Sequence, residues 1–129
     1  MYRILVIEDS QPMRHMFSAL LKGEGYECVL AGDIATGYSA CTKGKPDLVL
    51  LDVNLPDGDG IDLCRRLKSE PALRHIPILI ITGEEYSIEN KVAGLESGAD
   101  DFVIKPFKNK EFLARLRGIL KAASRPSVQ

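Results

Sequence analysis

The sequence predicts an α/β domain: a three-layer, doubly wound sandwich in which a five-stranded parallel sheet carries five helices on its two faces. Five short apolar runs of strand length recur along the chain, at residues 4–7, 26–31, 48–52, 78–81 and 102–104. A helix-like stretch follows each of them. Strands that alternate with helices in this way form βαβ units, which make successive strands parallel. The chain length of 129 residues fits one domain.

Each predicted strand is bounded by turn residues. The runs at 48–52 and 78–81 are apolar almost throughout, which is typical of strands buried on both faces. Pro46 precedes the first of these runs and Pro77 precedes the second, and the Gly32-Asp33 turn follows the run at 26–31. These boundaries predict strands of ordinary length.

The segments between the strands show helical apolar spacing. In the first of them, Ser10 is a helix cap, Pro12 falls in the first turn and Gly23 ends the helix. The stripes are Met13, Met16, Phe17, Leu20 and Leu21; Ile34, Tyr38 and Cys41; Ile61, Cys64 and Leu67; Ile88, Val92 and Leu95; and Phe112, Leu113, Leu116, Ile119 and Leu120. Residues 122–129 carry no stripe, so we expect the domain to comprise residues 1–121 and residues 122–129 to be a C-terminal tail or the start of a linker.

Composition excludes several classes of protein. With 17 basic and 18 acidic side chains, the net charge of −1 gives no global attraction to nucleic acid or to an anionic membrane, so we expect this chain to bind neither directly. The apolar run at 4–7 is too short for a signal peptide or a membrane span. The three cysteines form no CxxC motif, which predicts free buried thiols in a reducing compartment. We therefore expect a cytoplasmic protein.

Four of the predicted strands end in polar side chains: Glu8 and Asp9, then Asp52, Thr82 and Lys105. The carboxyl ends of parallel strands share one edge of a sheet, where open α/β sheets bind ligands. Like charges about 4 Å apart cost roughly 4 kcal/mol at an effective dielectric constant near 20. Three carboxylates (−3) and one ammonium (+1) leave −2, which a divalent cation would neutralise. Carboxylate oxygens suit Mg²⁺, or Mn²⁺ in its place.

These groups suit phosphoryl transfer. Asp52 would be the nucleophile that becomes an aspartyl phosphate, and Glu8 and Asp9 would hold the metal together with it. Lys105 would contact one phosphoryl oxygen, and the Thr82 hydroxyl would donate a hydrogen bond to another. Each residue has a structural explanation as well, such as a turn, a helix cap, a strand end or a solvated charge. Four strands that all end in mutually useful groups favour the functional explanation.

The sequence resembles the receiver domain of bacterial response regulators, the chemotaxis-regulator-like phosphoacceptor domain of two-component signalling, over about residues 2–121. The matching segments are residues 4–9, 47–52, 55–60, 77–82 and 98–107. The resemblance implies a flavodoxin-like fold with strand order 2-1-3-4-5. It also implies Mg²⁺-dependent phosphorylation of Asp52 by a histidine kinase or phosphotransfer protein, and control of a downstream protein or a fused output domain. Catalysis would be limited to the domain's own phosphorylation and dephosphorylation.

Further residue roles follow from the resemblance alone. The backbone carbonyl of Asn54 is expected to bind the metal, and a cis peptide bond is expected at Lys105–Pro106. Thr82 and Phe102, the latter in place of a commoner tyrosine, would form a switch that reshapes the surface of the fourth helix, fifth strand and fifth helix. Asn54 and Glu84 match positions that tune dephosphorylation.

The resemblance also suggests a phosphorylation-linked homodimer. The charged residues that match the pairing face of DNA-binding regulators are Lys91, Asp100, Asp101, Glu111 and Arg115. The alternative is a solvated charged face, since individual surface pairs are weak.

Two other functions fit the predicted topology. A flavin-binding electron carrier would need a phosphate-binding loop after the first strand, where Glu8 and Asp9 would repel a phosphate. A receiver-fold docking module that works without phosphorylation would not need Asp52, Thr82 and Lys105 together.

Overall fold

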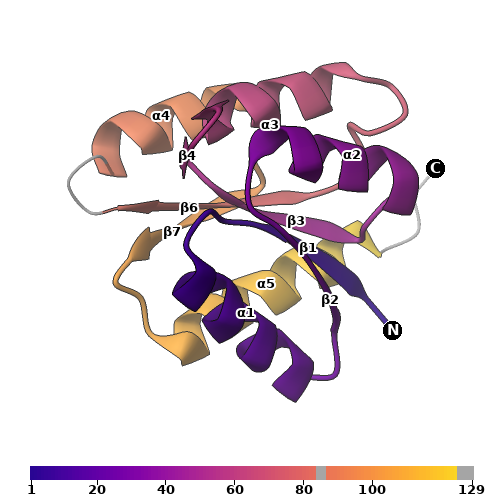
Figure 1. The fold of residues 1–129 in the computed structure, drawn as a ribbon, viewed down its shortest axis with the longest axis vertical. Helices are drawn as coiled ribbons and strands as arrows, with labels where there is room; N and C mark the ends of the chain where they lie inside the picture. Colours follow the sequence, from indigo (N-terminus) through magenta and orange to yellow (C-terminus); the bar gives the residue numbers. More distant parts are fainter. Residues whose placement is uncertain (84–86, 125–129) are drawn as a thin grey trace.

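A parallel sheet of five strands forms the middle layer of the molecule (Figure 1). The computed structural model describes residues 1–83 and 87–124, without the side chains of residues 87 and 88. The strands of the sheet are β1 (Arg3–Ile7), β2 (Glu27–Ala31), β3 (Leu48–Asp52), β6 (Ile78–Gly83) and β7 (Asp101–Lys105). The sheet order is β2-β1-β3-β6-β7. Counted along the chain, this is the predicted order 2-1-3-4-5, and all four pairings are parallel.

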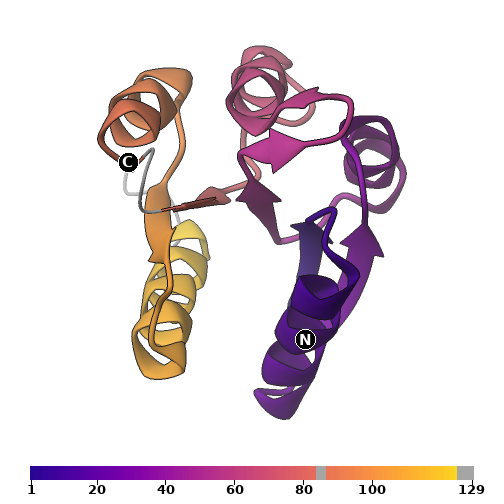
Figure 2. The same ribbon diagram turned by 60° about the vertical axis from the view of Figure 1, so that its left-hand side comes forward.

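Five helices cover the sheet, two on one face and three on the other. They are α1 (Gln11–Gly23), α2 (Ile34–Gly44), α3 (Gly60–Ser69), α4 (Ser87–Ser97) and α5 (Asn109–Ala123). Figures 1 and 2 show α1 and α5 on one side of the sheet and α2, α3 and α4 on the other. The predicted three-layer sandwich is therefore confirmed. Helix α5 continues to Ala123, two residues beyond the expected boundary at residue 121.

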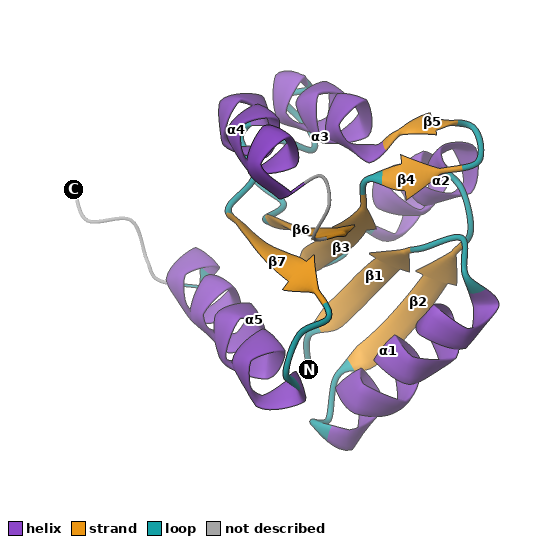
Figure 3. Ribbon diagram, turned by 90° about the vertical axis from the view of Figure 1, so that its left-hand side faces the viewer, coloured by secondary structure: helices purple, strands orange, loops and turns teal. Residues whose placement is uncertain are grey.

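One small element was not predicted from the sequence. Two-residue strands, β4 (Asn54–Leu55) and β5 (Gly58–Asp59), pair antiparallel between β3 and α3 (Figure 3). Asp57, at the turn of this hairpin, accepts hydrogen bonds from the backbone amides of Ile34 (2.8 Å) and Ala35 (3.1 Å). A carboxylate at a helix N-terminus satisfies amides that have no partner within the helix. The hairpin is thus fastened to the start of α2.

Alternating side chains of the central strands pack into two apolar cores, one on each face of the sheet. Ile4 and Val6 of β1 pack in the layer of α1 and α5, whereas Leu5 and Ile7 pack against α2 and α3. This alternation is the two-residue period of a strand, and because both faces are covered the middle residues of these strands are apolar. Aromatic rings strengthen the first core, where the Phe17 ring lies 5.4 Å from that of Phe112.

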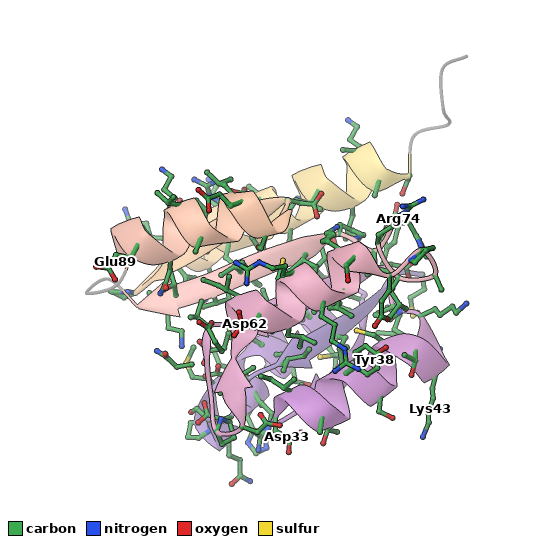
Figure 4. The ribbon with its side chains drawn as sticks, turned by 90° about the horizontal axis from the view of Figure 1, so that it is seen from above. Asp33, Tyr38, Lys43, Asp62, Arg74 and Glu89 are labelled. Atoms are coloured by element: carbon green, nitrogen blue, oxygen red, sulfur yellow. The ribbon has the colours of Figure 1, made fainter. Side chains whose placement is uncertain are left out.

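A network of side chains joins α2 to α3 on the outer surface, where Tyr38 is seen in Figure 4. The Tyr38 hydroxyl donates to both carboxylate oxygens of Glu70, at 2.8 and 2.7 Å. The Arg66 guanidinium lies 3.7 Å from the centroid of the Tyr38 ring. Cys41 and Cys64 are buried near these helices and Cys28 is half-buried, and all three are free thiols.

Helix α4 is present as predicted, but two residues of its predicted apolar stripe lie at the surface. Val92 and Leu95 are 53% and 56% exposed. Ala93 packs against the core and Ser97 is buried. A Cβ atom built at Gly94 would lie 3.1 Å from the Cδ1 atom of Ile80. Small residues therefore line the sheet side of α4 and bring it close to β6, while larger apolar residues form part of the surface.

None of the helices among the described residues is long and apolar enough to cross a membrane.

Candidate functional site

The sheet register brings the predicted site residues to one edge. In the parallel ladders Ile7 pairs with Leu51, Asp52 with Ile81, and Gly83 with Lys105. The strands β1, β3, β6 and β7 therefore end at nearly the same level. Glu8 and Asp9, Asp52, Thr82 and Lys105 meet there, as the strand-end pattern predicts.

Three carboxylates form a cluster at this edge. Glu8, Asp9 and Asp52 each offer an oxygen, and these oxygens lie within 4.8 Å of one another. Glu8 and Asp52 are 3% and 6% exposed, whereas Asp9 is open to solvent. Like charges at this separation repel by about 3 to 4 kcal/mol per pair at an effective dielectric constant near 20. A cation bound between the carboxylates would therefore reduce this repulsion.

Lys105 supplies one positive charge from the end of β7. Its Nζ atom lies 3.7 Å from Glu8 Oε1 and 3.7 Å from Asp52 Oδ2, so one ammonium bridges two carboxylates. The peptide bond between Lys105 and Pro106 is cis, the form that the resemblance implies. If all three carboxylates were ionised (−3), Lys105 (+1) would leave the cluster with a charge of −2.

Glu8 shows most clearly that the cluster suits a cation. Its Oε2 atom is buried and has no hydrogen-bond partner among the described residues. Burial is the largest cause that raises the pKa of Glu8 to about 8; the neighbouring Asp52 contributes to this rise, and the charge of Lys105 opposes it. A buried oxygen without a partner, in a set of hard oxygen donors, fits a small divalent cation such as Mg²⁺.

Arg14, a residue not predicted from the sequence, holds the backbone of the acidic pair. The Nη1 atom of Arg14 donates to the carbonyl oxygens of Glu8 (2.7 Å) and Asp9 (2.9 Å). These bonds fix the chain where it leaves β1. The only sequence signal was a basic residue five positions after Asp9.

The segment after β3 is packed tightly against Asp52. The backbone amide of Asn54 donates to Asp52 Oδ1 at 3.3 Å, and the amide of Gly60 donates to the carbonyl of Val53 at 2.7 Å. A Cβ atom at Gly60 would lie only 2.1 Å from the carbonyl oxygen of Asp52. Glycine is therefore required where α3 begins beside the strand end. The role of the Asn54 carbonyl toward a metal stays a prediction.

The two predicted switch residues each contact α4. Thr82 is buried, and its Oγ1 atom accepts a hydrogen bond from Asn90 Nδ2 at 2.5 Å. Phe102 is half-exposed, and Lys91 Nζ lies 5.1 Å from the centroid of its ring. Asn90 is a second residue that sequence reasoning missed. Glu84 lies outside the described residues.

The charged face predicted for dimerisation is brought together only in part. A groove of about 920 Å³ between α4, β7 and α5 is lined by Lys91, Asp101, Glu111 and Arg115, among others. Arg115 pairs with Asp101 at 2.9 Å and with Glu111 at 3.3 Å within the chain. Asp100 points elsewhere: it accepts from the backbone amide of Ile78 at 2.8 Å and pairs with the ammonium of Lys68 at 3.3 Å.

Comparison with known proteins identifies this arrangement. The family model for the response regulator receiver domain matches residues 4–117. The phosphate regulon transcriptional regulatory protein PhoB of Pseudomonas aeruginosa is 43% identical over 120 residues, covering 92% of this chain and 51% of that protein. The DNA-binding response regulator MtrA of Mycolicibacterium smegmatis is also 43% identical, over 92% of this chain and 50% of that protein. The chain thus spans about half the length of these curated relatives.

Solved structures of receiver domains share this fold. The signal receiver domain of a signal transduction histidine kinase from Syntrophus aciditrophicus superposes with a TM-score of 0.90 at 31% identity, covering 100% of this chain and 97% of that one. The receiver domain of a sensor histidine kinase from Pseudomonas aeruginosa has a magnesium ion coordinated in its active site cleft; its TM-score is 0.84 at 26% identity, covering 93% of this chain and 98% of that one. Fold, strand-end residues and relatives lead to one conclusion: the chain belongs to the receiver domain family of response regulators.

Proposed function

We propose that this chain accepts a phosphoryl group on Asp52 in a Mg²⁺-dependent reaction and thereby acts as a signalling switch in the cytoplasm. The observation that carries the proposal is the position of Asp52. Its carboxylate is buried at the end of β3, one oxygen lies 3.7 Å from Lys105 Nζ, and Glu8 and Asp9 lie beside it. Groups suited to act as a nucleophile, as a cation for the phosphoryl oxygens and as metal ligands therefore lie together, and this supports the proposal.

In the proposed reaction a carboxylate oxygen of Asp52 attacks the phosphorus atom of the donor. The P–N bond of a phosphohistidine breaks, and its electron pair leaves with the imidazole. The donor would be a histidine kinase or a phosphotransfer protein. Lys105 would bind one phosphoryl oxygen, and the Thr82 hydroxyl would turn to donate to another.

The residues present suit a divalent cation that would be held by Glu8, Asp9, Asp52 and the backbone carbonyl of Asn54. When bound, Mg²⁺ or Mn²⁺ would neutralise charge on the transferred phosphoryl group. Beyond its own phosphorylation and dephosphorylation, with Asn54 and Glu84 tuning the latter, the domain would catalyse no reaction. The output would be read by a downstream protein or by a fused domain.

Incubation of the chain with acetyl phosphate and Mg²⁺ tests this function. Intact-mass spectrometry is expected to show a gain of one phosphoryl group per chain that requires Mg²⁺, because a small phosphodonor needs only the groups described above. The matched control is Asp52→Asn, which keeps the shape of the side chain but removes the nucleophile and is expected to gain none. If the folded wild-type protein gains no phosphoryl group and does not bind beryllofluoride, the domain would instead be a phosphorylation-independent docking module.

We further propose that phosphorylation promotes a homodimer through the groove between α4, β7 and α5. The groove is lined by partly exposed residues of both charges. It also contains two apolar residues, Leu95 of α4 and Ile104 of β7, which are 56% and 37% exposed. In a two-fold dimer, a residue of one copy contacts the partner residue of the other. The pair between Arg115 and Asp101 could then form across the interface as well as within one chain.

A charge exchange tests the dimer by sedimentation in the presence of beryllofluoride. Arg115→Glu and Asp101→Arg are each expected to weaken dimerisation about tenfold or more, because each variant places like charges opposite each other. An equimolar mixture of the two variants is expected to recover the dimer, since both interfacial pairs are then complementary. A wild-type protein that stays monomeric with beryllofluoride bound would exclude the proposed dimer.

A further inference from the structure

Both switch residues are held by consecutive residues of α4. Asn90 donates to the Thr82 hydroxyl oxygen, and the ammonium of Lys91 lies over the ring of Phe102. The side chains of adjacent helical residues point about 100° apart. Helix α4 can therefore contact Thr82 at the end of β6 and Phe102 in the neighbouring strand β7. The position of α4 therefore affects both halves of the switch.

The contact between Asn90 and Thr82 is set by the way α4 packs on β6. Gly94 allows close approach to Ile80, where a Cβ atom would lie 3.1 Å from Cδ1. Asn90 is one turn before Gly94, and Thr82 is two residues after Ile80 on the same face of the strand. One helical turn advances about 5.4 Å, and two strand residues advance about 6.6 Å. Because the helix runs back along the strand, the glycine contact places Asn90 beside Thr82.

The surroundings of Thr82 make this bond selective for one orientation of its side chain. Thr82 is only 1% exposed, so water does not compete for its hydroxyl. Among the described residues, the hydrogen bond that Thr82 Oγ1 accepts comes from Asn90, and none joins Thr82 to Asp52. A threonine side chain has few stable rotamers, and a hydrogen bond to its oxygen favours the one that points toward the donor.

We propose that Asn90 is a positioning residue that holds Thr82 in its unphosphorylated orientation, so that α4 lowers the affinity of Asp52 for a phosphoryl group until this bond is released. The inference rests on the proposed function, because it concerns the same phosphoryl site. A bond that exists only in the unphosphorylated state shifts the equilibrium away from the phosphorylated state by its own net free energy. Removal of the Asn90 amide should therefore strengthen phosphoryl-group binding.

The dissociation constant of beryllofluoride in the presence of Mg²⁺ measures this effect, for example by titration of ¹H–¹⁵N spectra. Asn90→Ala is expected to bind beryllofluoride about three- to tenfold more tightly than wild type, the factor given by the usual net strength of one hydrogen bond. Glu96→Ala, an exposed substitution on the same helix, controls for the helix-favouring effect of alanine and is expected to leave the affinity unchanged.

A double-mutant cycle with Thr82→Val separates positioning from a general effect on α4. Valine keeps the shape of threonine but lacks the hydroxyl, so adding Asn90→Ala to Thr82→Val is expected to change the affinity no further. The inference is overturned if Asn90→Ala binds no more tightly than wild type, or if its effect persists beside Thr82→Val. If wild type itself binds no beryllofluoride and gains no phosphoryl group, the proposed function fails instead.

Discussion

Alanine in place of Gly60 is expected to lower the free energy of unfolding by more than about 3 kcal/mol. The added Cβ atom would lie 2.1 Å from the carbonyl oxygen of Asp52 and 3.0 Å from the Cα atom of Val53. Both are backbone atoms at the end of a strand that is paired on both sides, so neither can move aside at small cost. Relief of the clash requires α3 to shift away from β3.

Urea unfolding followed by circular dichroism measures this loss, and Gly118→Ala is its matched control. Gly118 also lies in a helix, α5, but a Cβ atom there would meet nothing within 4 Å. Alanine at this exposed helical position is expected to stabilise the protein by about 0.5 to 1 kcal/mol. Equal stability of the Gly60→Ala variant and wild type would mean that α3 can leave its place beside Asp52 freely.

In the absence of divalent cations, Glu8→Gln is expected to stabilise the protein by a few kcal/mol at pH 8 while having little effect near pH 5. Burial raises the pKa of Glu8 from 4.5 in the unfolded chain to about 8 in the folded one. Between these values the folded state holds a proton that the unfolded state has lost, so wild-type stability falls as pH rises. Each unit of pKa difference contributes about 1.4 kcal/mol. Glutamine stays uncharged in both states and removes this dependence.

Unfolding free energies measured from pH 5 to 9 in the presence of a chelator test this prediction. The difference between Glu8→Gln and wild type is expected to grow up to about pH 8 and then to level off, because folded Glu8 is ionised above its pKa. Glu96→Gln, an exposed substitution, is expected to follow wild type throughout. A difference that does not change with pH would show that Glu8 is ionised in the folded protein.

Magnesium is expected to oppose the loss of wild-type stability at alkaline pH. A cation that binds only the folded state adds stability that grows with its concentration relative to the dissociation constant. Ionisation of Glu8 adds a ligand charge, so Mg²⁺ should stabilise wild type more at pH 8 than at pH 6. The Glu8→Gln variant, which lacks this carboxylate, should gain less from Mg²⁺ at either pH.

Much of the fold could be predicted because its signals are local. The largely apolar runs that became β3 and β6 need only neighbouring residues to be recognised, and so does the spacing of Phe17 and Leu21 in α1. The grouping of Asp52, Thr82 and Lys105 followed from topology, since parallel strands place their carboxyl ends together. The strand order itself came from the resemblance to a family.

Helix α4 is an element whose orientation the local sequence pattern did not predict. Val92 and Leu95 mark a helix correctly, yet the side of that helix facing β6 is chosen by Gly94, whose lack of a side chain lets the helix approach Ile80. The spacing of apolar residues shows which face of a helix is hydrophobic. It does not show which face fits closely against the neighbouring strand.

The sequence by itself thus determined the alternation of strands and helices, the apolar cores and the chemical groups at the strand ends. Only the tertiary structure decided that Arg14 fixes the acidic pair, that Asn90 contacts Thr82 and that burial raises the pKa of Glu8. The physical reason is range. Secondary structure depends on residues a few positions apart, whereas hydrogen bonds between elements and burial of a charge depend on distances of a few ångströms, which packing of the whole chain sets.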